Sequence, residues 1–455
     1  MRPALVLLMC AVMGACGFAA EPETRPHIVL FLIDDMRHDL MGCAGHAIVK
    51  TPCLDRLAAT GVRFDQARVT TSICMVSRAS ILTGQHMARH GITTFQQSLS
   101  ADAFAQTWPA RLQSAGYRTG YVGKYGVGKP PAGAFDFSRI YEGKHWMPVK
   151  GGADVHVTEK NRLDALEFLK DVKPTTPPFA LTVGFFAPHA EDRAEDQYLP
   201  QPESAAAYRN VVVPPPKLAS AEAFNVLPEF LRAEKNEGRV RFRKRFDTPE
   251  KFQDFSLRYF RLITEVDAAI GSIVARLTTA GVLDKTLIVV IGDNGYFLGE
   301  RGLADKWYPY EEALRVPFLI CDPRLNAVKR GMVLSDRVLN IDVLPTILNA
   351  VGLKLSKQIS GEDAARFYLD ETPAAGRSEF HYEHPVVLGK DRIPRSEALV
   401  GKTEKWIRWP DFDREQHFDL TRDPEELDDL ARRPEFAAKR ADFRKRMAEA
   451  RTRIE

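Results

Sequence analysis

Two pairs of oxygen-bearing side chains follow apolar runs of this sequence. The run HIVLFLI ends at Asp34 and Asp35, and the run TLIVVIG ends at Asp293 and Asn294. Hard cations such as Ca²⁺ take roughly six to eight oxygen ligands, and carboxylates crowded together without a counter-charge repel one another. We therefore predict that these four residues bind calcium, with Mg²⁺ as the less favoured ion. The alternative for either pair alone is a loop turn or a helix cap, which Asp and Asn commonly form.

A cysteine and an arginine in the segment SICMVSRASILTG form a second candidate group. Cys74 precedes a predicted helix over about residues 75–82, and Arg78, four residues on, shares its face. A helix N-terminus attracts anions through its unpaired N–H groups and its dipole, and arginine suits bidentate contact with oxyanions. The pair is predicted to face an anion. The alternative is a buried thiol beside a surface charge.

Four short runs rich in Val, Ile and Phe are predicted to form the strands that position these residues. They span residues 27–33, 119–123, 179–186 and 286–292. Helical patterns lie between them, at residues 51–60, 107–115, 162–171 and 256–280. Continuous apolar strands alternating with helices indicate an open, mostly parallel sheet, in which ligands bind beyond the carboxyl ends of the strands. The polar residues at these ends are therefore expected to form one site.

The predicted fold class is α/β, with a large mixed, mostly parallel sheet sandwiched by helices. A smaller C-terminal α+β subdomain with an antiparallel sheet is expected to follow, because residues 397–409 alternate like a strand or hairpin. A charged helix is predicted from residue 434 to the end. The predicted division is a signal peptide over residues 1–20, a catalytic domain over 24–365 and the subdomain over 366–455.

Seven segments of the chain carry a resemblance to a known family. SICMVSRASILTG resembles the sulfatase signature C-x-P-S-R-x-x-x-L-T-G, and Cys74 and Arg78 stand in register with it. Blocks similar to those of the same family follow in family order: residues 33–36, 48–58, 123–128, 187–190, 292–317 and 419–431. The chain is thus identified as a member of the formylglycine-dependent type I sulfatases of the alkaline phosphatase-like superfamily, over about residues 26–431.

The resemblance implies hydrolysis of a sulfate ester, on a carbohydrate or another small molecule. A maturation enzyme would oxidise Cys74 to formylglycine, whose hydrated form attacks sulfur, while Asp34, Asp35, Asp293 and Asn294 bind calcium, which also touches residue 74. Arg78 would orient the nucleophile. The sulfate oxygens would be neutralised by Lys124, His189 and Lys306, and either His189 or Lys306 could protonate the leaving oxygen. These cationic groups suit sulfuryl transfer, which spreads charge over oxygens.

The sequence departs from the family pattern at two positions. Val76 replaces the proline of the signature, in a stretch that the maturation enzyme reads. Gly126 stands where the family usually has a histidine that helps to eliminate sulfate. His145 is the candidate replacement from the same loop region, with a solvated loop histidine as the alternative.

Two other functions remain open from the sequence. A phosphonate or phosphodiester hydrolase uses the same scaffold and nucleophile. A relative that is never matured could bind sulfated glycans without hydrolysing them, although the intact metal and sulfate-binding residues argue against such a role.

The composition describes an ordinary globular protein with an export signal. The 455 residues carry a net charge of +3, and no stretch interleaves basic and aromatic residues as a nucleic-acid site would. Residues 4–15 form an apolar run after Arg2, which predicts a secretory signal and a periplasmic or extracellular protein; a lipid on Cys16 is the alternative. No other segment is long and apolar enough for a membrane span. The basic run at residues 239–246 is interpreted as a solvated helix face or as a rim that attracts anions.

The remaining reactive side chains receive simpler interpretations. His86 and His90 are expected to make local hydrogen bonds, and Trp307 to stack on a sugar or pack in the core. The segment HYEHP, which holds His381, Glu383 and His384, lies where the family often has substrate contacts. A Cys43–Cys53 disulfide has no support beyond spacing, and the absence of CxxC pairs argues against a zinc site of that kind.

Overall fold

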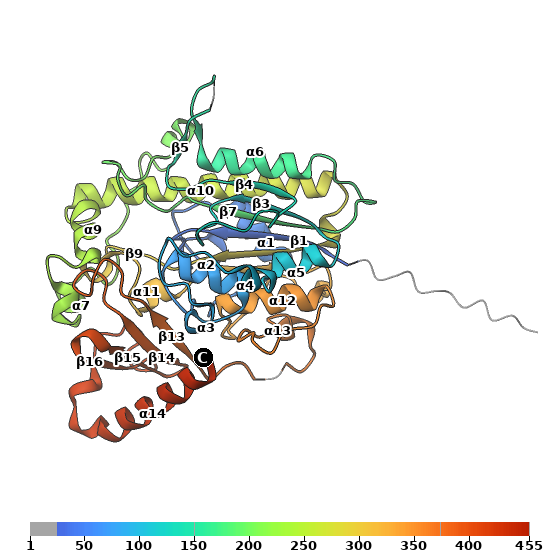
Figure 1. Cartoon of the computed structure of the whole chain (residues 1–455). Coiled ribbons are helices and arrows are strands. Elements are labelled where there is room, and N and C mark those ends of the chain that lie inside the picture. Colours follow the sequence, from blue (N-terminus) through green and yellow to red (C-terminus); the bar gives the residue numbers. More distant parts are fainter. Residues whose placement is uncertain (1–24, 150, 374, 455) are drawn as a thin grey trace, which may run out of the picture.

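A computed structural model describes residues 25–149, 151–373 and 375–454 of the chain (Figure 1). The predicted signal peptide and Cys16 lie outside the described residues. Within them, an eight-stranded sheet has the order β12-β2-β11-β8-β1-β7-β3-β4. Its strands are β1 (His27–Ile33), β2 (Val62–Phe64), β3 (Arg118–Gly123), β4 (Phe137–Ile140), β7 (Phe179–Phe185), β8 (Thr286–Gly292), β11 (Phe318–Cys321) and β12 (Met332–Leu334).

The sheet is mixed and mostly parallel, as predicted. β8, β1, β7, β3 and β4 run parallel to one another, whereas β11 is antiparallel to both β8 and β2. The four predicted strands are neighbours at its centre, in the order β8-β1-β7-β3. Every residue of β1, β7 and β8 is buried, which is why their sequences are continuously apolar instead of alternating.

Helices cover both faces of the sheet (Figure 1). Alternate residues of β1 pack against the helices on opposite faces. Ile28, Leu30 and Leu32 pack into the core with α2 and α12, while Val29, Phe31 and Ile33 pack into the core with α1 and α10, as the twofold period of a strand requires. The longer helices are α1 (Pro52–Thr60), α2 (Cys74–Thr83), α5 (Trp108–Ser114), α6 (Val157–Leu169), α9 (Glu237–Arg245), α10 (Pro249–Thr279) and α12 (Val343–Ala350). The shorter ones are α3 (Met87–His90), α4 (Ala101–Ala105), α7 (Ala221–Asn225), α8 (Glu229–Arg232), α11 (Glu311–Leu314) and α13 (Arg366–Leu369).

The C-terminal part forms the predicted separate antiparallel sheet, with the order β13-β14-β15-β16. Its strands are β13 (Glu379–His384), β14 (Ser396–Gly401), β15 (Glu404–Trp409) and β16 (Arg414–Asp419). The charged helix α14 (Ala437–Ile454) packs Phe443 and Met447 against Leu399 and Trp406 of this sheet. Two small ribbons, β5 (Trp146–Met147) with β6 (Val155–His156) and β9 (Phe297–Leu298) with β10 (Ala304–Asp305), lie in the loops.

Candidate functional site

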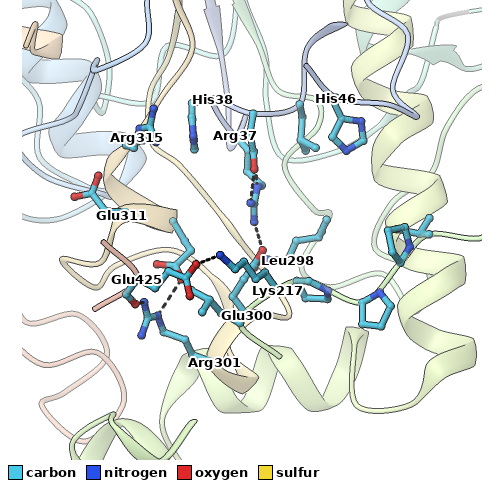
Figure 2. A pocket seen from close by; sticks show the side chains of 18 of the residues that line it. Arg37, His38, His46, Lys217, Leu298, Glu300, Arg301, Glu311, Arg315 and Glu425 are labelled. Carbon is cyan, nitrogen blue, oxygen red and sulfur yellow. Dashed lines mark hydrogen bonds and ion pairs between the residues drawn. The ribbon is translucent and has the colours of Figure 1, made fainter. Parts of the chain in front are cut away.

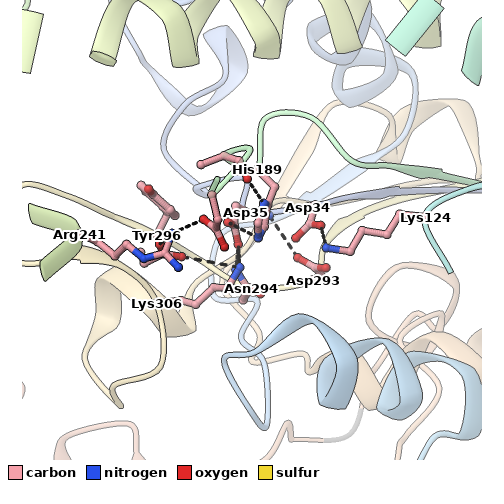
Figure 3. Close-up of polar contacts among 12 residues, drawn as sticks. Asp34, Asp35, Lys124, His189, Arg241, Asp293, Asn294, Tyr296 and Lys306 are labelled. Atoms are coloured by element: carbon pink, nitrogen blue, oxygen red, sulfur yellow. Dashed lines mark hydrogen bonds and ion pairs between the residues drawn. The ribbon is translucent and has the colours of Figure 1, made fainter. Parts of the chain in front are cut away.

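The predicted site residues converge at the carboxyl ends of four neighbouring strands (Figure 3). Asp34 and Asp35 follow β1, and Asp293 and Asn294 follow β8. Lys124 follows β3, and His189 lies four residues beyond the end of β7. The order of the strands in the sheet therefore explains why residues more than a hundred positions apart in the chain meet at one place.

The two acidic pairs form a cluster of buried oxygen atoms. The Asp35 amide donates to Asp293 Oδ1 at 3.2 Å, and Asn294 Nδ2 donates to Asp35 Oδ1 at 2.6 Å. Three other oxygens have no hydrogen-bond donor among the described residues, namely Asp34 Oδ1, Asp35 Oδ2 and Asn294 Oδ1, while Asp34 Oδ2 forms an ion pair with Lys124. Because a buried acceptor without a donor is costly, these oxygens fit a hard cation that binds through carboxylate and amide ligands.

His189 lies at the edge of this cluster. Its Nε2 is 3.7 Å from Asp35 Oδ2, and the ligand atoms of Asp34, Asp35 and His189 all lie within 4.8 Å of one another. Its Nδ1 is 2.6 Å from the Ala190 carbonyl, an acceptor, so Nδ1 carries a proton there. The Nε2 atom is thus turned toward the site, as its expected role requires. The excess of oxygen over nitrogen in the cluster favours calcium over a transition metal.

Arg78 connects helix α2 to the ends of three strands. Its Nε donates to Asp293 Oδ2 at 2.7 Å, its Nη1 donates to the Lys124 carbonyl at 2.6 Å, and Asp34 lies 3.7 Å away. The side chain is fully buried, so the alternative of a surface charge is wrong. Cys74 is the first residue of α2 and is buried beside it, at the helix end where unpaired N–H groups favour anions.

Val76 occupies a position that tolerates the loss of proline. It is the third residue of α2 and is buried, and the first intrahelical bond of this turn runs from the Ser77 amide to the Ile73 carbonyl. The first amides of a helix have no intrahelical acceptor in any case, so valine keeps the turn intact. Whether the maturation enzyme accepts valine there stays a prediction.

The two predicted sulfate-binding lysines contact the acidic cluster. Lys124 forms an ion pair with Asp34, and Lys306 forms one with Asp35 and lies 3.9 Å from Asp305 (Figure 3). Lys306 sits between two non-glycine residues of left-handed backbone, Asp305 with φ 76° and Trp307 with φ 84°. Such conformations cost roughly 1–3 kcal/mol each and persist where the surroundings hold them, which is consistent with a segment shaped to present Lys306.

Burial and charge shift the pKa values of the cluster in opposite directions. Burial alone raises the pKa of Asp34, but Lys124, His189 and Arg78 outweigh it and hold that pKa well below its usual range. Burial raises the pKa of Asp35 and of Asp293 to about 6. A bound cation would favour the charged form of both carboxylates. This is a further reason for the cluster to take a metal ion.

Two further groups have pKa values that matter for chemistry. Burial raises the pKa of the Cys74 thiol to about 11, so an unmodified cysteine here is a weak nucleophile because it stays protonated at neutral pH. Burial, followed by the charge of Lys306, lowers the pKa of His189 to about 4. An anion bound nearby would raise this pKa again by favouring the imidazolium.

The sequence analysis missed a buried ion-pair network behind Lys306. Arg245 donates to Asp305 Oδ2 at 2.7 Å and to the Tyr296 hydroxyl at 2.6 Å, and Arg241 pairs with Asp192. Arg245 belongs to the basic run 239–246 and is fully buried, so neither a solvated face nor an anion-attracting rim describes it. The sequence held no local signal for this network, because Arg245 and Asp305 belong to segments that are 60 positions apart in the chain.

The structure gives no support to His145 as a catalytic base. Its Nε2 donates to the His189 carbonyl at 3.0 Å, and its Nδ1 accepts from the Leu199 amide at 3.2 Å. Both ring nitrogens are therefore engaged by backbone. The alternative of a solvated loop histidine is also wrong, because the residue is buried. His145 instead supports the loop that carries His189.

The backbone at Gly126 is adapted to glycine. Its φ is +72°, and a Cβ atom there would lie 2.7 Å from Arg78 Cδ. A histidine at this position would strain the backbone and displace Arg78. The Arg78 side chain therefore occupies the space that a larger residue at position 126 would need.

The simpler interpretations are mostly confirmed. His90 has both nitrogens engaged, with Ser80 Oγ at 3.1 Å and the Ile92 amide at 3.1 Å. Trp307 is buried, which agrees with core packing. Cys43 and Cys53 are free thiols, so the disulfide between them is not formed. His86 differs from the expectation, because its Nδ1 has no hydrogen-bond partner among the described residues.

A separate cavity of about 540 Å³ contains none of the predicted site residues (Figure 2). Its charged side chains neutralise one another: Arg37 Nη1 lies 2.5 Å from Glu300, and Lys217 pairs with Glu425. Because two of its charged pairs are already neutralised and it gathers none of the predicted site residues, it is a weaker candidate for chemistry than the strand-end cluster.

Two protein-family models match the chain, and one relative aligns with nearly all of it. The family model described as "Sulfatase" matches residues 26–353, and the model described as "N-sulphoglucosamine sulphohydrolase, C-terminal" matches residues 299–453. The N-acetylglucosamine-6-O-sulfatase of Bacteroides thetaiotaomicron is 27% identical, over 97% of this chain and 89% of that protein. The first match spans the strand-end cluster in full.

Two solved structures share the fold. The structure of BT4656 in complex with its substrate D-glucosamine-2-N,6-O-disulfate superimposes with a TM-score of 0.78 and 24% identity, covering 95% of this chain and 98% of that one. The phosphonate monoester hydrolase of Agrobacterium radiobacter superimposes with a TM-score of 0.78 and 20% identity, covering 95% and 96%. At such identities the likeness establishes the common architecture of the main sheet and the C-terminal sheet.

Proposed function

The chain belongs to the sulfatase family and is a sulfuric ester hydrolase. We propose that it removes sulfate from a carbohydrate, and that it uses calcium and a formylglycine made from Cys74. The observation that carries the proposal is the strand-end cluster. Asp34, Asp35 and Asn294 present oxygens without hydrogen-bond donors among the described residues, and Asp293 lies with them, held by the Asp35 amide and by Arg78 of the helix that begins at Cys74. An unmatured glycan binder is not retained, because the relatives are hydrolases.

Calcium bound to the four oxygen-bearing residues would supply positive charge to polarise the sulfate ester. Conversion of Cys74 to formylglycine would supply a hydrated aldehyde, and so an oxygen nucleophile in place of a protonated thiol. The remaining steps belong to the chain's own side chains. Arg78, held by Asp293 and the Lys124 carbonyl, fixes the position of residue 74 relative to the strand ends.

Lys124, Lys306 and His189 are proposed to bind the sulfate oxygens. Each of them lies beside a carboxylate of the cluster in this structure. Calcium held by those carboxylates would supply the charge that balances them, which would leave the lysine ammonium groups available to the anion. Charge stabilisation of this kind is the main source of catalysis when charge spreads over equatorial oxygens. The His189 imidazole, anchored through Nδ1 on the Ala190 carbonyl, then offers Nε2 to the substrate.

An amino sugar carrying a 6-O-sulfate is the proposed substrate class. The support is the relative that acts as an N-acetylglucosamine-6-O-sulfatase, which aligns with 97% of this chain. The second candidate is a phosphonate monoester hydrolase, supported by the shared architecture. Both reactions need a metal, a nucleophile and cations at the same positions, so the cluster alone does not separate them.

The first experiment measures, by mass spectrometry, the mass of the peptide that spans Cys74 after co-expression with a formylglycine-generating enzyme. We expect the thiol to be replaced by an aldehyde that a hydrazine reagent traps. The control is a Val76→Pro variant, which restores the signature. An unmodified Cys74 in the wild type beside a converted Val76→Pro variant would show that this chain does not follow the proposed maturation.

The second experiment compares kcat/KM for N-acetylglucosamine-6-sulfate, an aryl sulfate and an aryl phosphonate monoester. We expect both sulfates to be hydrolysed faster than the phosphonate. Chelation of calcium should abolish turnover and lower Tm, and added calcium should restore both more fully than magnesium does. A higher rate on the phosphonate would replace the sulfatase proposal by its alternative.

We propose that the protein is exported. The proposal rests on the sequence of residues 1–20, which lie outside the described residues. None of the described helices is long and apolar enough to cross a membrane. Fractionation of the native host, with sequencing of the mature N-terminus, tests the proposal. We expect a periplasmic or extracellular protein that lacks residues 1–20; a lipid-modified Cys16 would favour the anchored alternative.

A further inference from the structure

Two histidines and a glutamate lie together outside the strand-end cluster. His86 follows α2 and caps the short helix α3, while His381 and Glu383 belong to β13 of the C-terminal sheet. One ligand atom from each residue lies within 4.8 Å of those of the other two. All three side chains are buried, with exposed fractions of 5%, 4% and 8%. The sequence separates His86 from the other two by almost three hundred positions.

The backbone on both sides of the cluster is fixed by hydrogen bonds. The Glu383 amide donates to the Thr70 carbonyl at 3.0 Å, and Glu383 Oε1 accepts from the Ala88 amide at 2.8 Å. Residues two apart on a strand share a face, so His381 and Glu383 point together toward His86. Tyr382, on the opposite face, bonds Ser72 Oγ at 2.6 Å and the Trp307 carbonyl at 3.0 Å.

The imidazole nitrogens of this cluster lack hydrogen-bond partners. Nδ1 and Nε2 of His381 and Nδ1 of His86 are buried and have no partner among the described residues. His90, in the same segment as His86, has both nitrogens engaged. Since most buried polar groups in folded proteins are paired, these nitrogens, which lie together with a carboxylate, are free to accept a ligand.

We propose that His86, His381 and Glu383 bind a divalent transition-metal ion, with zinc as the expected metal. Imidazole suits zinc and its neighbours in the transition series, whereas calcium prefers oxygen ligands such as those of the strand-end cluster. Three protein ligands leave one tetrahedral position open. A cavity of about 130 Å³ lined by His86 and His381 has room for a water there. Arg377, which also lines it, is held by Asp342 through two bonds of 2.6 Å.

The metal would connect the catalytic core to the C-terminal sheet. His86 lies just beyond the helix that begins with Cys74, and β13 contacts the loop before that helix through Tyr382 and Glu383. A metal bond at this junction adds a link that does not rely on apolar contact. The ion is therefore expected to stabilise the fold and to hold the segment after α2 in place, with no direct contact to the substrate.

The test measures zinc content by mass spectrometry on the full-length matured enzyme. The protein is dialysed in zinc-buffered solution with excess calcium, so that the strand-end cluster is filled. We expect one zinc per chain in the wild type. Loss of one ligand should weaken zinc binding by more than about 100-fold, because even the loss of an outer-shell partner costs about 10–100-fold. The variants are His86→Ala, His381→Gln and Glu383→Gln, the last of which keeps an acceptor for the Ala88 amide.

His384→Gln is the matched control, because His384 is buried on the same strand with an unpaired Nε2 but is not among the three residues whose ligand atoms lie within 4.8 Å of one another. It should retain full zinc content. Cobalt replacing zinc should give visible absorption bands that disappear in His381→Gln, a readout independent of activity and of stability. Circular dichroism identifies any variant that fails to fold. A wild type without stoichiometric zinc or cobalt, or ligand variants that bind as the wild type does, would overturn the proposal.

Discussion

At the scale of single residues, the site contains two candidates for the acid that protonates the leaving alcohol. His189 Nε2 faces the cluster and its Nδ1 is anchored on the Ala190 carbonyl, and Lys306 pairs with Asp35. The pKa of His189 is lowered to about 4 by burial and Lys306, while Asp35 and Cys74 raise that of Lys306 above its usual value against the effect of burial. The anion must therefore raise the pKa of His189 before it can act.

The dependence of kcat on the leaving group distinguishes His189 from Lys306 as the acid. The variant that lacks the acid should lose about 10²–10⁴-fold in kcat with alcohols of high pKa and far less with nitrophenol, which leaves without a proton. We expect His189→Ala to show this pattern, and Lys306→Ala to lose activity evenly across all leaving groups because it removes charge stabilisation. Rates of both variants on a series of aryl and alkyl sulfates provide the measurement. The reverse pattern would assign the acid to Lys306.

Gly126 is predicted to matter for activity through Arg78. In Gly126→Ala the new Cβ would lie 2.7 Å from Arg78 Cδ. The alanine would also have to adopt the left-handed φ of +72° that the glycine has. Gly116→Ala carries the same kind of strain at φ +88° with nothing within 4 Å. Both variants should lose about 1–2 kcal/mol of stability, and only Gly126→Ala should lose kcat, by tenfold or more. Equal activity in the two variants would mean that Arg78 adapts freely. Urea unfolding and steady-state kinetics measure both effects.

At the scale of elements, the C-terminal sheet is predicted to support the catalytic loops. The Tyr382 hydroxyl of β13 lies between Ser72, before α2, and the Trp307 carbonyl, after Lys306. Tyr382→Phe leaves both buried groups without this partner, at a cost of about 1–3 kcal/mol, and should reduce kcat because two segments that flank the site lose a common anchor. The measurements are the free energy of unfolding and kcat.

Tyr117→Phe is the control for this prediction. Its hydroxyl donates to the Pro26 carbonyl at 2.9 Å, just before β1 begins. This contact lies at the amino-terminal end of β1, whereas the site lies at the carboxyl end. It should lower stability alone. If both variants reduce kcat to the same extent, the effect of Tyr382 is one of general stability and not of loop position.

The strands that carry the metal-binding pairs could be predicted because the apolar run and the polar residues that end it are neighbours in the sequence. Residues 27–33 and 286–292 are continuously apolar and end abruptly at Asp, so both the strand and its polar end could be read directly. The lysine and histidine positions came from the family resemblance. The Arg245–Asp305 network and the His86–His381–Glu383 cluster could not be predicted, because each depends on contacts between segments far apart in the chain. The burial of Arg245 within the basic run was not predicted for the same reason, since the sequence shows a charge and not its partner; the other basic residues of the run are half-buried or exposed.

At the scale of the whole molecule, buried histidines should make the fold sensitive to acid. Burial lowers the pKa of His156 to about 4 and of His384 to about 3, and burial together with Lys285 lowers that of His27 to about 4. In the unfolded chain these groups titrate near 6.5. Between about pH 6.5 and pH 3–4 the unfolded state therefore binds more protons, so stability is complete above pH 6.5 and falls as the pH drops.

Two carboxylates act in the opposite direction unless calcium is bound. The pKa values of Asp35 and Asp293 are raised to about 6, so in the folded protein they take up protons before the unfolded chain does, and this stabilises the fold as the pH falls through that range. Excess calcium keeps both ionised and removes their contribution. The acid transition should therefore be measured with calcium present, so that these two carboxylates do not oppose the histidines.

His27→Asn tests the contribution of one histidine. His27 Nδ1 accepts from the Phe179 amide at 3.2 Å, and an asparagine oxygen can replace that acceptor without taking up a proton. Each histidine contributes a slope of up to about 1.4 kcal/mol per pH unit, so the free energy of unfolding of the variant should fall less steeply between pH 6.5 and pH 4. Urea unfolding over this range, with calcium present, measures the slope. An unchanged slope would show that His27 is protonated in the folded protein as readily as in the unfolded chain, and that its burial does not keep it neutral.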